Sequence, residues 1–139
     1  MKLFFDVNVV LDVLTAREPW AHDSATAMSL LELEEMDGMI AAHAVTTIHY
    51  LVSRSGRNRA NGAVLDLLHL FEIASVDESS LAEALALEAR DFEDAVQAVC
   101  AVRSGADCFV TRNPDDYRDF GMRVFTPTEL LAYLEATGN

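Results

Sequence analysis

Short apolar runs alternate with longer helical patterns along the whole chain, and this alternation restricts the fold more than any other feature. Five of the runs have the length and apolar content of buried strands. They lie at residues 3–7, 39–42, 71–76, 108–111 and 123–125. Strands that alternate with helices form a parallel sheet with helices on both faces. We therefore expect an α/β fold in which ligands bind beyond the carboxyl ends of the strands.

Helical patterns fill the segments between the predicted strands. They lie at residues 9–14, 21–36, 46–53, 58–70, 78–89, 92–103 and from 127 onward. Asp77 and Asp91 are placed to cap the helices that follow them. The segment Thr126-Pro127-Thr128-Glu129 has the pattern of a capping box with proline at the first helical position. No repeat or linker divides the chain, so residues 1–139 are expected to form a single domain.

The chain is strongly acidic, with 10 basic and 23 acidic residues and a net charge of -13. This balance argues against a protein that coats nucleic acid or a polybasic membrane binder, because both classes need net positive charge to gather phosphate. It leaves open an enzyme that acts on nucleic acid, since carboxylates can hold divalent cations that then meet the phosphate.

Several features favour a cytoplasmic location. The apolar N-terminal run is interrupted by Asp6 and Asp12, and no small-residue cleavage site follows it, so a signal peptide is not expected. No uncharged apolar stretch approaches the length of a membrane span. Cys100 and Cys108 match no zinc-binding spacing, and both are interpreted as buried reduced thiols.

Acidic side chains from distant parts of the chain fall at the ends of predicted strands. Asp6 lies near the end of the first strand, Asp116 lies beyond the fourth, and Asp91 and Asp94 open the helix that leads into the fourth. Because the carboxyl ends of parallel strands share one edge of a sheet, these acids are expected to converge there. Carboxylates packed together are stabilised by cations, and Mg²⁺ prefers a few carboxylates with water and substrate phosphate.

Simpler interpretations exist for some of these acids. Asp91 and Asp94 occupy the N-cap and N3 positions of a helix, where carboxylates are favoured by free N–H groups and the helix dipole. Asp116 is equally consistent with a solvated turn. Asp6 is harder to explain in this way, because an acid inside an apolar strand costs several kcal/mol to bury unless it is paired or bound to metal. Asp12 is expected to face solvent or to pair with a neighbouring arginine.

Three segments together resemble the PIN domain family over essentially the whole chain. They are FFDVNVVLDVL, DFEDAVQAVCAVRSGADCFVTRNPDDY and TPTEL. The resemblance implies a three-layer α/β/α sandwich with a five-stranded parallel sheet and a Mg²⁺- or Mn²⁺-dependent ribonuclease, which is a hydrolase of RNA. Small stand-alone members in bacteria are often VapC-like toxins. It therefore also implies an RNA substrate, a cognate antitoxin protein and a homodimer.

The resemblance assigns roles by position in the motifs. Asp6, Asp94 and Asp116 match the catalytic acids that hold the metal ion, and Asp91 is a candidate additional ligand. Three further polar positions match residues that orient the acids or their waters. They are Asn8, Thr111 and Asn113.

The middle of the chain departs from the family pattern. Most active members carry a glutamate early in the helix after the second strand, but no acid lies between Gly38 and Asp66 here, and His49 falls nearest that place. This difference keeps open an alternative function, a PIN-like domain with little or no catalysis that binds RNA or protein. Two other enzyme classes fit poorly. A receiver-type phosphoacceptor needs a lysine after the last strand, whereas the only lysine is Lys2, and a haloacid-dehalogenase-type phosphatase needs aspartate where Asn8 stands.

One turn concentrates basic residues. Arg54, Arg57 and Arg59 fall within a short segment around Gly56. The segment is either an exposed connection between two helices or a local patch that grips RNA phosphate. Trp20 is expected to act as an anchor in the core or at an interface.

Overall fold

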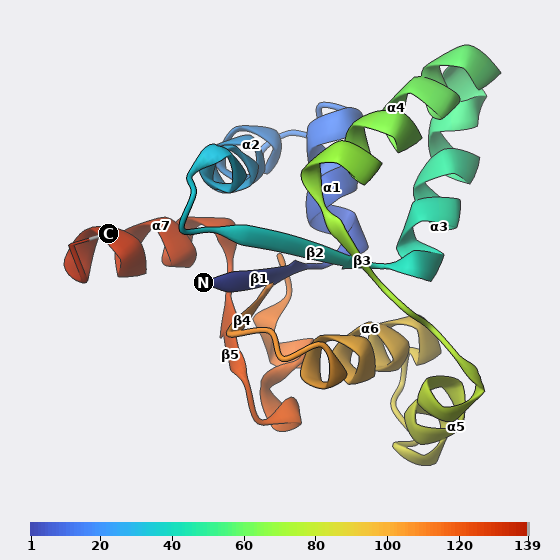
Figure 1. Cartoon of the computed structure of the whole chain (residues 1–139), viewed down its shortest axis with the longest axis vertical. Helices are drawn as coiled ribbons and strands as arrows, with labels where there is room; N and C mark the ends of the chain where they lie inside the picture. Colours follow the sequence, from blue (N-terminus) through green and yellow to red (C-terminus); the bar gives the residue numbers. More distant parts are fainter. Residues whose placement is uncertain (139) are drawn as a thin grey trace.

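Five parallel strands form one sheet at the centre of the molecule, in the order β3-β2-β1-β4-β5 (Figure 1). The computed structural model describes residues 1–138. The strands are β1 (Lys2–Phe5), β2 (Asp37–Ala41), β3 (Glu72–Ala74), β4 (Cys108–Val110) and β5 (Arg123–Phe125). From β1 the chain adds β2 and β3 on one side, and it then adds β4 and β5 on the other side, so the strand order reverses between β1 and β4. Open α/β sheets bind their ligands at such a point.

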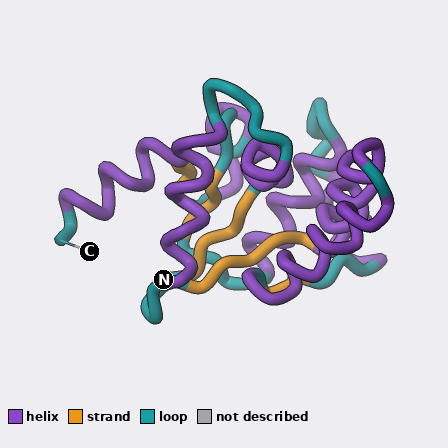
Figure 2. Tube along the Cα trace, turned by 90° about the horizontal axis from the view of Figure 1, so that it is seen from above, coloured by secondary structure: helices purple, strands orange, loops and turns teal. Residues whose placement is uncertain are grey.

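Helices cover both faces of the sheet and complete the predicted three-layer sandwich (Figures 1 and 2). One face carries α1 (Val7–Leu14), α2 (Ala21–Ser29), α3 (Ala42–Val52), α4 (Arg57–Leu70) and α7 (Pro127–Ala136). The other face carries α5 (Glu78–Ala86) and α6 (Phe92–Arg103). Within residues 1–138, no helix has both the length and the apolar character needed to cross a bilayer.

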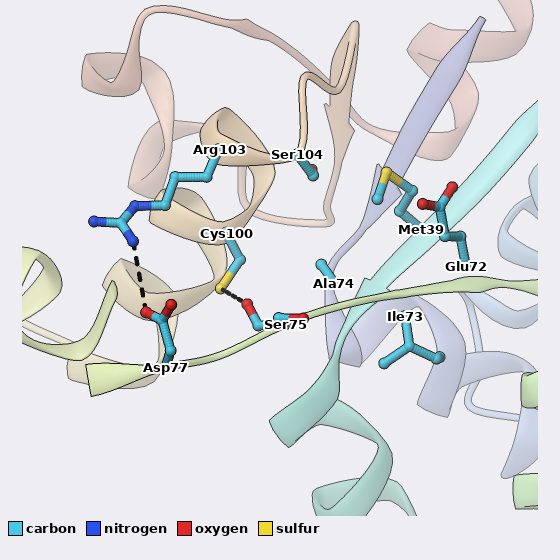
Figure 3. A pocket seen from close by; sticks show the side chains of 9 residues that line it. All are labelled: Met39, Glu72, Ile73, Ala74, Ser75, Asp77, Cys100, Arg103 and Ser104. Atoms are coloured by element: carbon cyan, nitrogen blue, oxygen red, sulfur yellow. Dashed lines mark hydrogen bonds and ion pairs between the residues drawn. The ribbon is translucent and has the colours of Figure 1, made fainter. Parts of the chain in front are cut away.

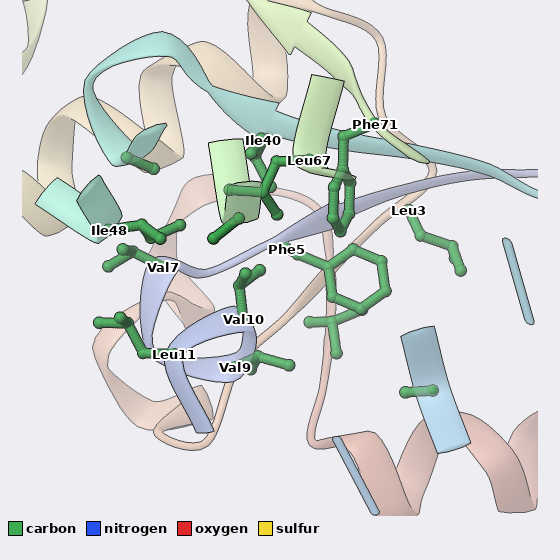
Figure 4. Close-up of a cluster of buried hydrophobic side chains, with 14 of the residues drawn as sticks. Leu3, Phe5, Val7, Val9, Val10, Leu11, Ile40, Ile48, Leu67 and Phe71 are labelled. Atoms are coloured by element: carbon green, nitrogen blue, oxygen red, sulfur yellow. The ribbon is translucent and has the colours of Figure 1, made fainter. Parts of the chain in front are cut away.

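The strands bury side chains on both faces, as a parallel sheet requires. In β1, Leu3 and Phe5 point into the larger core beneath α1 to α4 and α7, whereas Phe4 points into the core beneath α5 and α6. Figure 4 shows Phe5 and Phe71 in the larger core, with their rings packed edge to face at 5.5 Å. Because Leu3, Phe4 and Phe5 of β1 are all fully buried, the end of the strand is held firmly and positions Asp6, which follows it.

The expected helix caps are present. Asp77 accepts a hydrogen bond from Ser80 N and Ser80 Oγ accepts one from Asp77 N, which forms a reciprocal capping box. Asp91 caps α6, and Thr126 with Glu129 forms the predicted capping box of α7. Each cap satisfies backbone N–H groups that have no partner within the helix.

Two helix boundaries depart furthest from the sequence prediction. The helix expected over 21–36 ends at Ser29, and a short 3₁₀ turn over Leu30–Glu32 follows. The acidic residues that follow would lie at the negative end of the helix dipole, which disfavours its continuation. The helix expected to begin at Thr46 begins at Ala42, directly after β2. Its N-cap residue is Ala41, which has no side chain that can cap, so the sequence gives no signal for this start.

Candidate active site

Asp6 lies at the junction of β1 and α1, at the carboxyl edge of the sheet. Its backbone N–H donates to Val110 O of β4 at 2.9 Å, which continues the sheet pairing by one residue. Its side chain then caps α1, because Oδ1 accepts from Asn8 N at 3.2 Å. The residue is 2% exposed. The helix N-terminus favours the carboxylate at this place, although burial alone would oppose it.

Two further donors hold the Asp6 carboxylate. Thr111 Oγ1, at the end of β4, donates to Oδ2 at 2.7 Å. Gln97 Nε2, in the middle of α6, donates to Oδ1 at 3.1 Å. Both carboxylate oxygens therefore accept hydrogen bonds, and the side chain is fixed in one orientation between β1, β4 and α6.

Gln97 and Tyr117 connect Asp6 to Asp94. Gln97 is fully buried, and its Oε1 accepts from Val7 N at 3.0 Å, so its Nε2 must face Asp6 and the Tyr117 hydroxyl 3.4 Å away. Tyr117 donates that hydroxyl to Asp94 Oδ1 at 2.8 Å. The resulting chain of hydrogen bonds is directional, because each amide or hydroxyl has only one arrangement that satisfies both of its neighbours.

Asp94 has an unusual proton affinity. Burial raises the pKa of its carboxyl to about 6, and the carboxylates of Asp91, Asp6 and Asp116 add to the increase. The hydrogen bond from Tyr117 opposes this shift by stabilising the charged form. These three acids therefore each lie within electrostatic reach of Asp94.

A cavity of about 320 Å³, which we call the acid cavity, opens above Asp94. Asp91, Asp94 and Asp116 line it, together with Arg90 and Phe120. Asp91 caps α6 by accepting from Asp94 N at 3.1 Å, and Asp116 closes the 3₁₀ turn Pro114–Asp116 after β4. The structure thus brings three of the predicted acids to one cavity. Asp6 does not line it but lies behind Gln97 and Tyr117.

Comparisons with known proteins identify the family of the chain. A family model described as PIN domain matches residues 2–115, which is most of the chain. The chain belongs to the PIN domain family. Ribonuclease VapC1 of Aquifex aeolicus (strain VF5) is 23% identical over 121 residues, which cover 84% of each protein.

Solved structures show the same fold at low sequence identity. VapBC-1 from nontypeable Haemophilus influenzae matches with a TM-score of 0.71 at 14% identity, covering 92% of this chain and 99% of that chain. VapBC2 from Rickettsia felis, bound to a promoter DNA fragment, matches with a TM-score of 0.68 at 13% identity, covering 91% and 98%. VapC20 of Mycobacterium tuberculosis, a toxin that cleaves the sarcin-ricin loop, matches with a TM-score of 0.62 at 16% identity, covering 77% and 86%.

Three further residues of this PIN domain lie near the acids but were not predicted as site residues from the sequence. They are Gln97, Tyr117 and Glu93. Burial raises the pKa of Glu93, and the charges of Asp91 and Asp6 raise it further. Glu93 precedes Gln97 by one helical turn and so shares its face of α6. The available signal was the polar Gln97 within the apolar run Ala95 to Ala101, since a buried amide needs a partner.

The predicted polar positions occupy the same edge of the PIN domain. Asn8 contributes its backbone N–H to the cap of α1, as described above. Asn113 donates its backbone N–H to Thr111 Oγ1 at 3.1 Å, which orients the Thr111 hydroxyl toward Asp6. Both contacts use the backbone, so the structure places these two residues near the acids without showing a role for their side chains.

The departure in the middle of this PIN domain has a structural counterpart. His49 Nε2 lies 2.8 Å from Asn61 Oδ1, so the side chain nearest the expected glutamate joins α3 to α4. The acid cavity is lined by residues of α6 and of the segments beside it and after β4.

The basic turn lies away from the acid cavity of the PIN domain. Arg59 donates to Leu14 O at 3.1 Å, and Arg54 lies over the Tyr50 ring at 5.6 Å. Leu14 ends α1, whereas Asp6 caps its beginning, and an eight-residue helix is about 12 Å long. Arg59 therefore lies at the far end of α1, and Arg54 and Arg57 are exposed on the same turn.

The residues of this PIN domain match a divalent cation in the kind of donor that they offer. Among residues 1–138, no three His, Cys, Asp or Glu side chains are arranged to hold a metal ion by themselves. Mg²⁺ is nevertheless usually held by one or two carboxylates, with water and substrate phosphate as the other ligands. Asp94, Asp91 and Asp116 supply such oxygens on the wall of one cavity.

A second cavity of the PIN domain, shown in Figure 3, has a different character. It has a volume of about 310 Å³ and lies against β2, β3 and α6. Arg103 on its wall pairs with Asp77 at 3.6 Å and Glu83 at 2.6 Å. Cys100 donates its thiol to Ser75 O at 3.6 Å, and burial raises the thiol pKa. Arg103, Asp77 and the Cys100 thiol on its wall thus already have partners within the protein.

Proposed function

We propose that this PIN domain is a metal-dependent endoribonuclease that hydrolyses phosphodiester bonds in RNA. One observation carries the proposal. Asp6 and Asp94 come from distant parts of the sequence and are joined through Gln97 and Tyr117 near the point where the strand order reverses. The VapC1 relative is named a ribonuclease, which supports RNA as the substrate.

In the proposed site, Asp6, Asp94 and Asp116 would hold Mg²⁺ or Mn²⁺, with Asp91 as an additional ligand. Asp6 lies behind Gln97 and Tyr117, so it would reach the ion once Gln97 Nε2 releases its carboxylate. The bound ion supplies Lewis-acid activation of a water molecule and of the scissile phosphate. Thr111 and Gln97 hold the Asp6 carboxylate in position, and Tyr117 does the same for Asp94. Such positioning contributes to catalysis because the carboxylates need not reorganise when substrate binds.

A biological role as the toxin of a type II toxin–antitoxin pair follows from the same likeness. Several solved structures with this fold are toxin–antitoxin complexes. On this proposal the chain acts in the cytoplasm as a homodimer, and a cognate antitoxin protein inhibits it. Expression of the chain should arrest growth, and co-expression of the neighbouring gene's product should relieve the arrest.

The activity is tested by incubating a panel of structured RNAs with Mg²⁺ or Mn²⁺ and the wild type, Asp6→Asn or Asp94→Asn. We expect cleavage by the wild type, and losses on the order of a hundredfold or more in each variant, since each removes a charge that acts at the reacting phosphate. A circular dichroism spectrum checks that the variants fold. Equal residual cleavage by all three proteins under both metals would exclude the nuclease.

A second candidate function is an RNA- or protein-binding PIN domain with weak or no catalysis. The full hydrogen bonding of Asp6 favours it, because both carboxylate oxygens already accept from protein donors. The basic turn of Arg54, Arg57 and Arg59 would then contribute to RNA binding by contacting phosphate. In this case RNA binds without being cleaved, and replacing the three arginines weakens binding.

A further inference from the structure

A third cavity, which we call the Trp20 cavity, lies between the start of α2 and the start of α7 and has a volume of about 340 Å³. Its walls include Trp20, Asp23, Ser24, Arg112, Thr126 and Thr128. This volume falls within the range of small-ligand sites, roughly 300–1,000 Å³. None of these residues lines the acid cavity.

Ser24 gives the Trp20 cavity an unsatisfied polar group. The residue is fully buried, it lines the cavity, and its Oγ has no hydrogen-bond partner in the protein. A buried hydroxyl without a partner destabilises the fold, so such groups are rare in native proteins. The hydroxyl is closed to solvent in the free protein, so a ligand atom that displaces the cavity wall at Ser24 would complete its hydrogen bonding.

Trp20 and Arg112 pack together and form one surface on the wall of this cavity. Trp20 is 43% exposed, and the Arg112 guanidinium carbon lies 4.0 Å from the centre of its ring. Arg112 Nε also pairs at 3.0 Å with Asp12 Oδ2, which is fully buried. The ion pair holds the guanidinium in place and offsets its charge. The surface therefore suits a planar, uncharged group more than a free phosphate.

The Trp20 cavity is linked to the proposed active site through β4. Arg112 directly follows Thr111, whose hydroxyl holds Asp6. Asp12, the partner of Arg112, lies close enough to Asp6 for the two charges to interact. A polymer whose backbone crosses the carboxyl ends of β1 and β4 can therefore reach both cavities.

We infer that the Trp20 cavity binds an unpaired nucleobase of the RNA substrate, and this inference rests on the proposed function. The base stacks on Trp20, and its polar edge meets Ser24 Oγ and the Asp23 carboxylate. Asp23 already accepts from Thr128 Oγ1 at 2.7 Å, and its negative charge favours base amino groups over phosphate. A paired base has its edge and both faces occupied, so the site selects single-stranded or looped RNA.

The binding test uses the intrinsic fluorescence of Trp20, which is the only tryptophan of the chain. A short unstructured oligoribonucleotide is titrated into the wild type with Ca²⁺, which takes the same oxygen ligands as Mg²⁺. We expect saturable quenching, and none from a fully paired RNA duplex. Quenching by an arginine-rich peptide with none by the oligoribonucleotide would instead assign the cavity to a protein partner and overturn the inference.

A matched pair of variants isolates the aromatic face. Trp20→Leu should weaken RNA affinity, or raise KM in cleavage, by about 5- to 100-fold, the usual loss when a base loses its stacking partner. Trp20→Phe keeps an aromatic ring at the same place and should lose less. Equal KM values for the wild type and Trp20→Leu, with cleavage intact, would reject the inference and leave the nuclease standing.

Ser24→Ala separates a ligand-binding role from a structural one. Because its hydroxyl has no partner in the free protein, its removal should keep or raise the melting temperature while weakening RNA affinity by about 2- to 10-fold. Unchanged affinity in Ser24→Ala would contradict the proposed hydrogen bond.

Failure of the wild type both to cleave and to bind RNA would remove the inference together with the proposed function. Binding and Trp20 quenching without cleavage would support the inference within the second candidate function.

Discussion

The Tyr117 hydroxyl donates to Asp94 Oδ1 at 2.8 Å. Among the described contacts, it is the only neutral donor that the segment after β4 offers to this half-buried carboxyl. The same hydroxyl lies 3.4 Å from Gln97 Nε2, which also donates to Asp6. Tyr117 is 2% exposed and its ring stacks on Phe109 at 4.2 Å. The core beneath β4 therefore fixes the position of one carboxylate relative to the other.

Tyr117→Phe is expected to raise the pKa of Asp94 above about 6, because it removes the hydrogen bond that favours the charged form. It should also lower the free energy of unfolding at pH 7 by about 1–3 kcal/mol. Carboxyl carbon NMR titration and urea unfolding measure the two effects. Tyr133→Phe is the control, since the Tyr133 hydroxyl contacts Arg123 on α7's side of the sheet. An unchanged Asp94 titration in Tyr117→Phe would show that the hydrogen bond has no effect on the carboxyl.

Asp94→Asn is expected to stabilise the metal-free protein at neutral pH. The folded state raises the pKa of Asp94 from 3.8 to about 6, so between these values the folded protein holds a proton that the unfolded chain releases. The free energy of unfolding therefore falls as pH rises through this window. Above pH 6 the charged carboxylate lowers the free energy of unfolding by about 1–3 kcal/mol. Asparagine carries no charge and should recover this free energy.

Urea unfolding with a chelator at pH 4 and pH 7.5 tests this expectation. The two proteins should differ little at pH 4, and the variant should be more stable at pH 7.5. Adding Mg²⁺ should stabilise the wild type more than Asp94→Asn, because a ligand that binds the folded state adds to its stability. A variant that is less stable than the wild type at both pH values would contradict the destabilisation assigned here to the charged Asp94 carboxylate.

The convergence of the acids was predictable because parallel strands place their carboxyl ends at one edge of the sheet. The alternation of apolar runs and helical patterns was enough to expect that edge. The connection through Gln97 and Tyr117 was not predictable, since it depends on how α6 rotates against the sheet. Local sequence patterns do not determine that rotation; packing of the whole core does.

Nonlocal ion pairing also limited the prediction for Asp12 and Trp20. Asp12 was expected to face solvent or to pair with a neighbouring arginine. Arg17, which is close in sequence, lies at 4.0 Å, but the nearer partner is Arg112 at 3.0 Å, from a distant part of the chain. Trp20 was expected in the core or at an interface. It is 43% exposed because the Arg112 side chain, rather than an apolar core, covers one face of its ring.

Gln97→Leu is expected to lower the free energy of unfolding by about 2–5 kcal/mol. The change leaves Val7 N without its acceptor and removes a donor from the buried Asp6 carboxylate, and unpaired buried groups are costly, charged ones most of all. Urea unfolding measures the loss. Val102→Ala on the exposed side of the same helix should change stability by about 0.5 kcal/mol or less. Equal effects of the two substitutions would show that the Gln97 contacts contribute little.

Asp91 is described by two roles, as the cap of α6 and as a proposed metal ligand, and a pair of substitutions distinguishes them. Asparagine caps helices about as well as aspartate, whereas alanine does not cap and costs about 1 kcal/mol. Asp91→Asn should therefore keep the stability of the metal-free protein, and Asp91→Ala should lose about that amount.

If Asp91 also contributes a carboxylate oxygen to the ion, both variants should bind Mn²⁺ more weakly than the wild type. Isothermal titration calorimetry with Mn²⁺, beside urea unfolding with a chelator, measures the two properties separately. Wild-type Mn²⁺ affinity in Asp91→Asn, combined with the loss of stability in Asp91→Ala, would assign Asp91 to the cap alone.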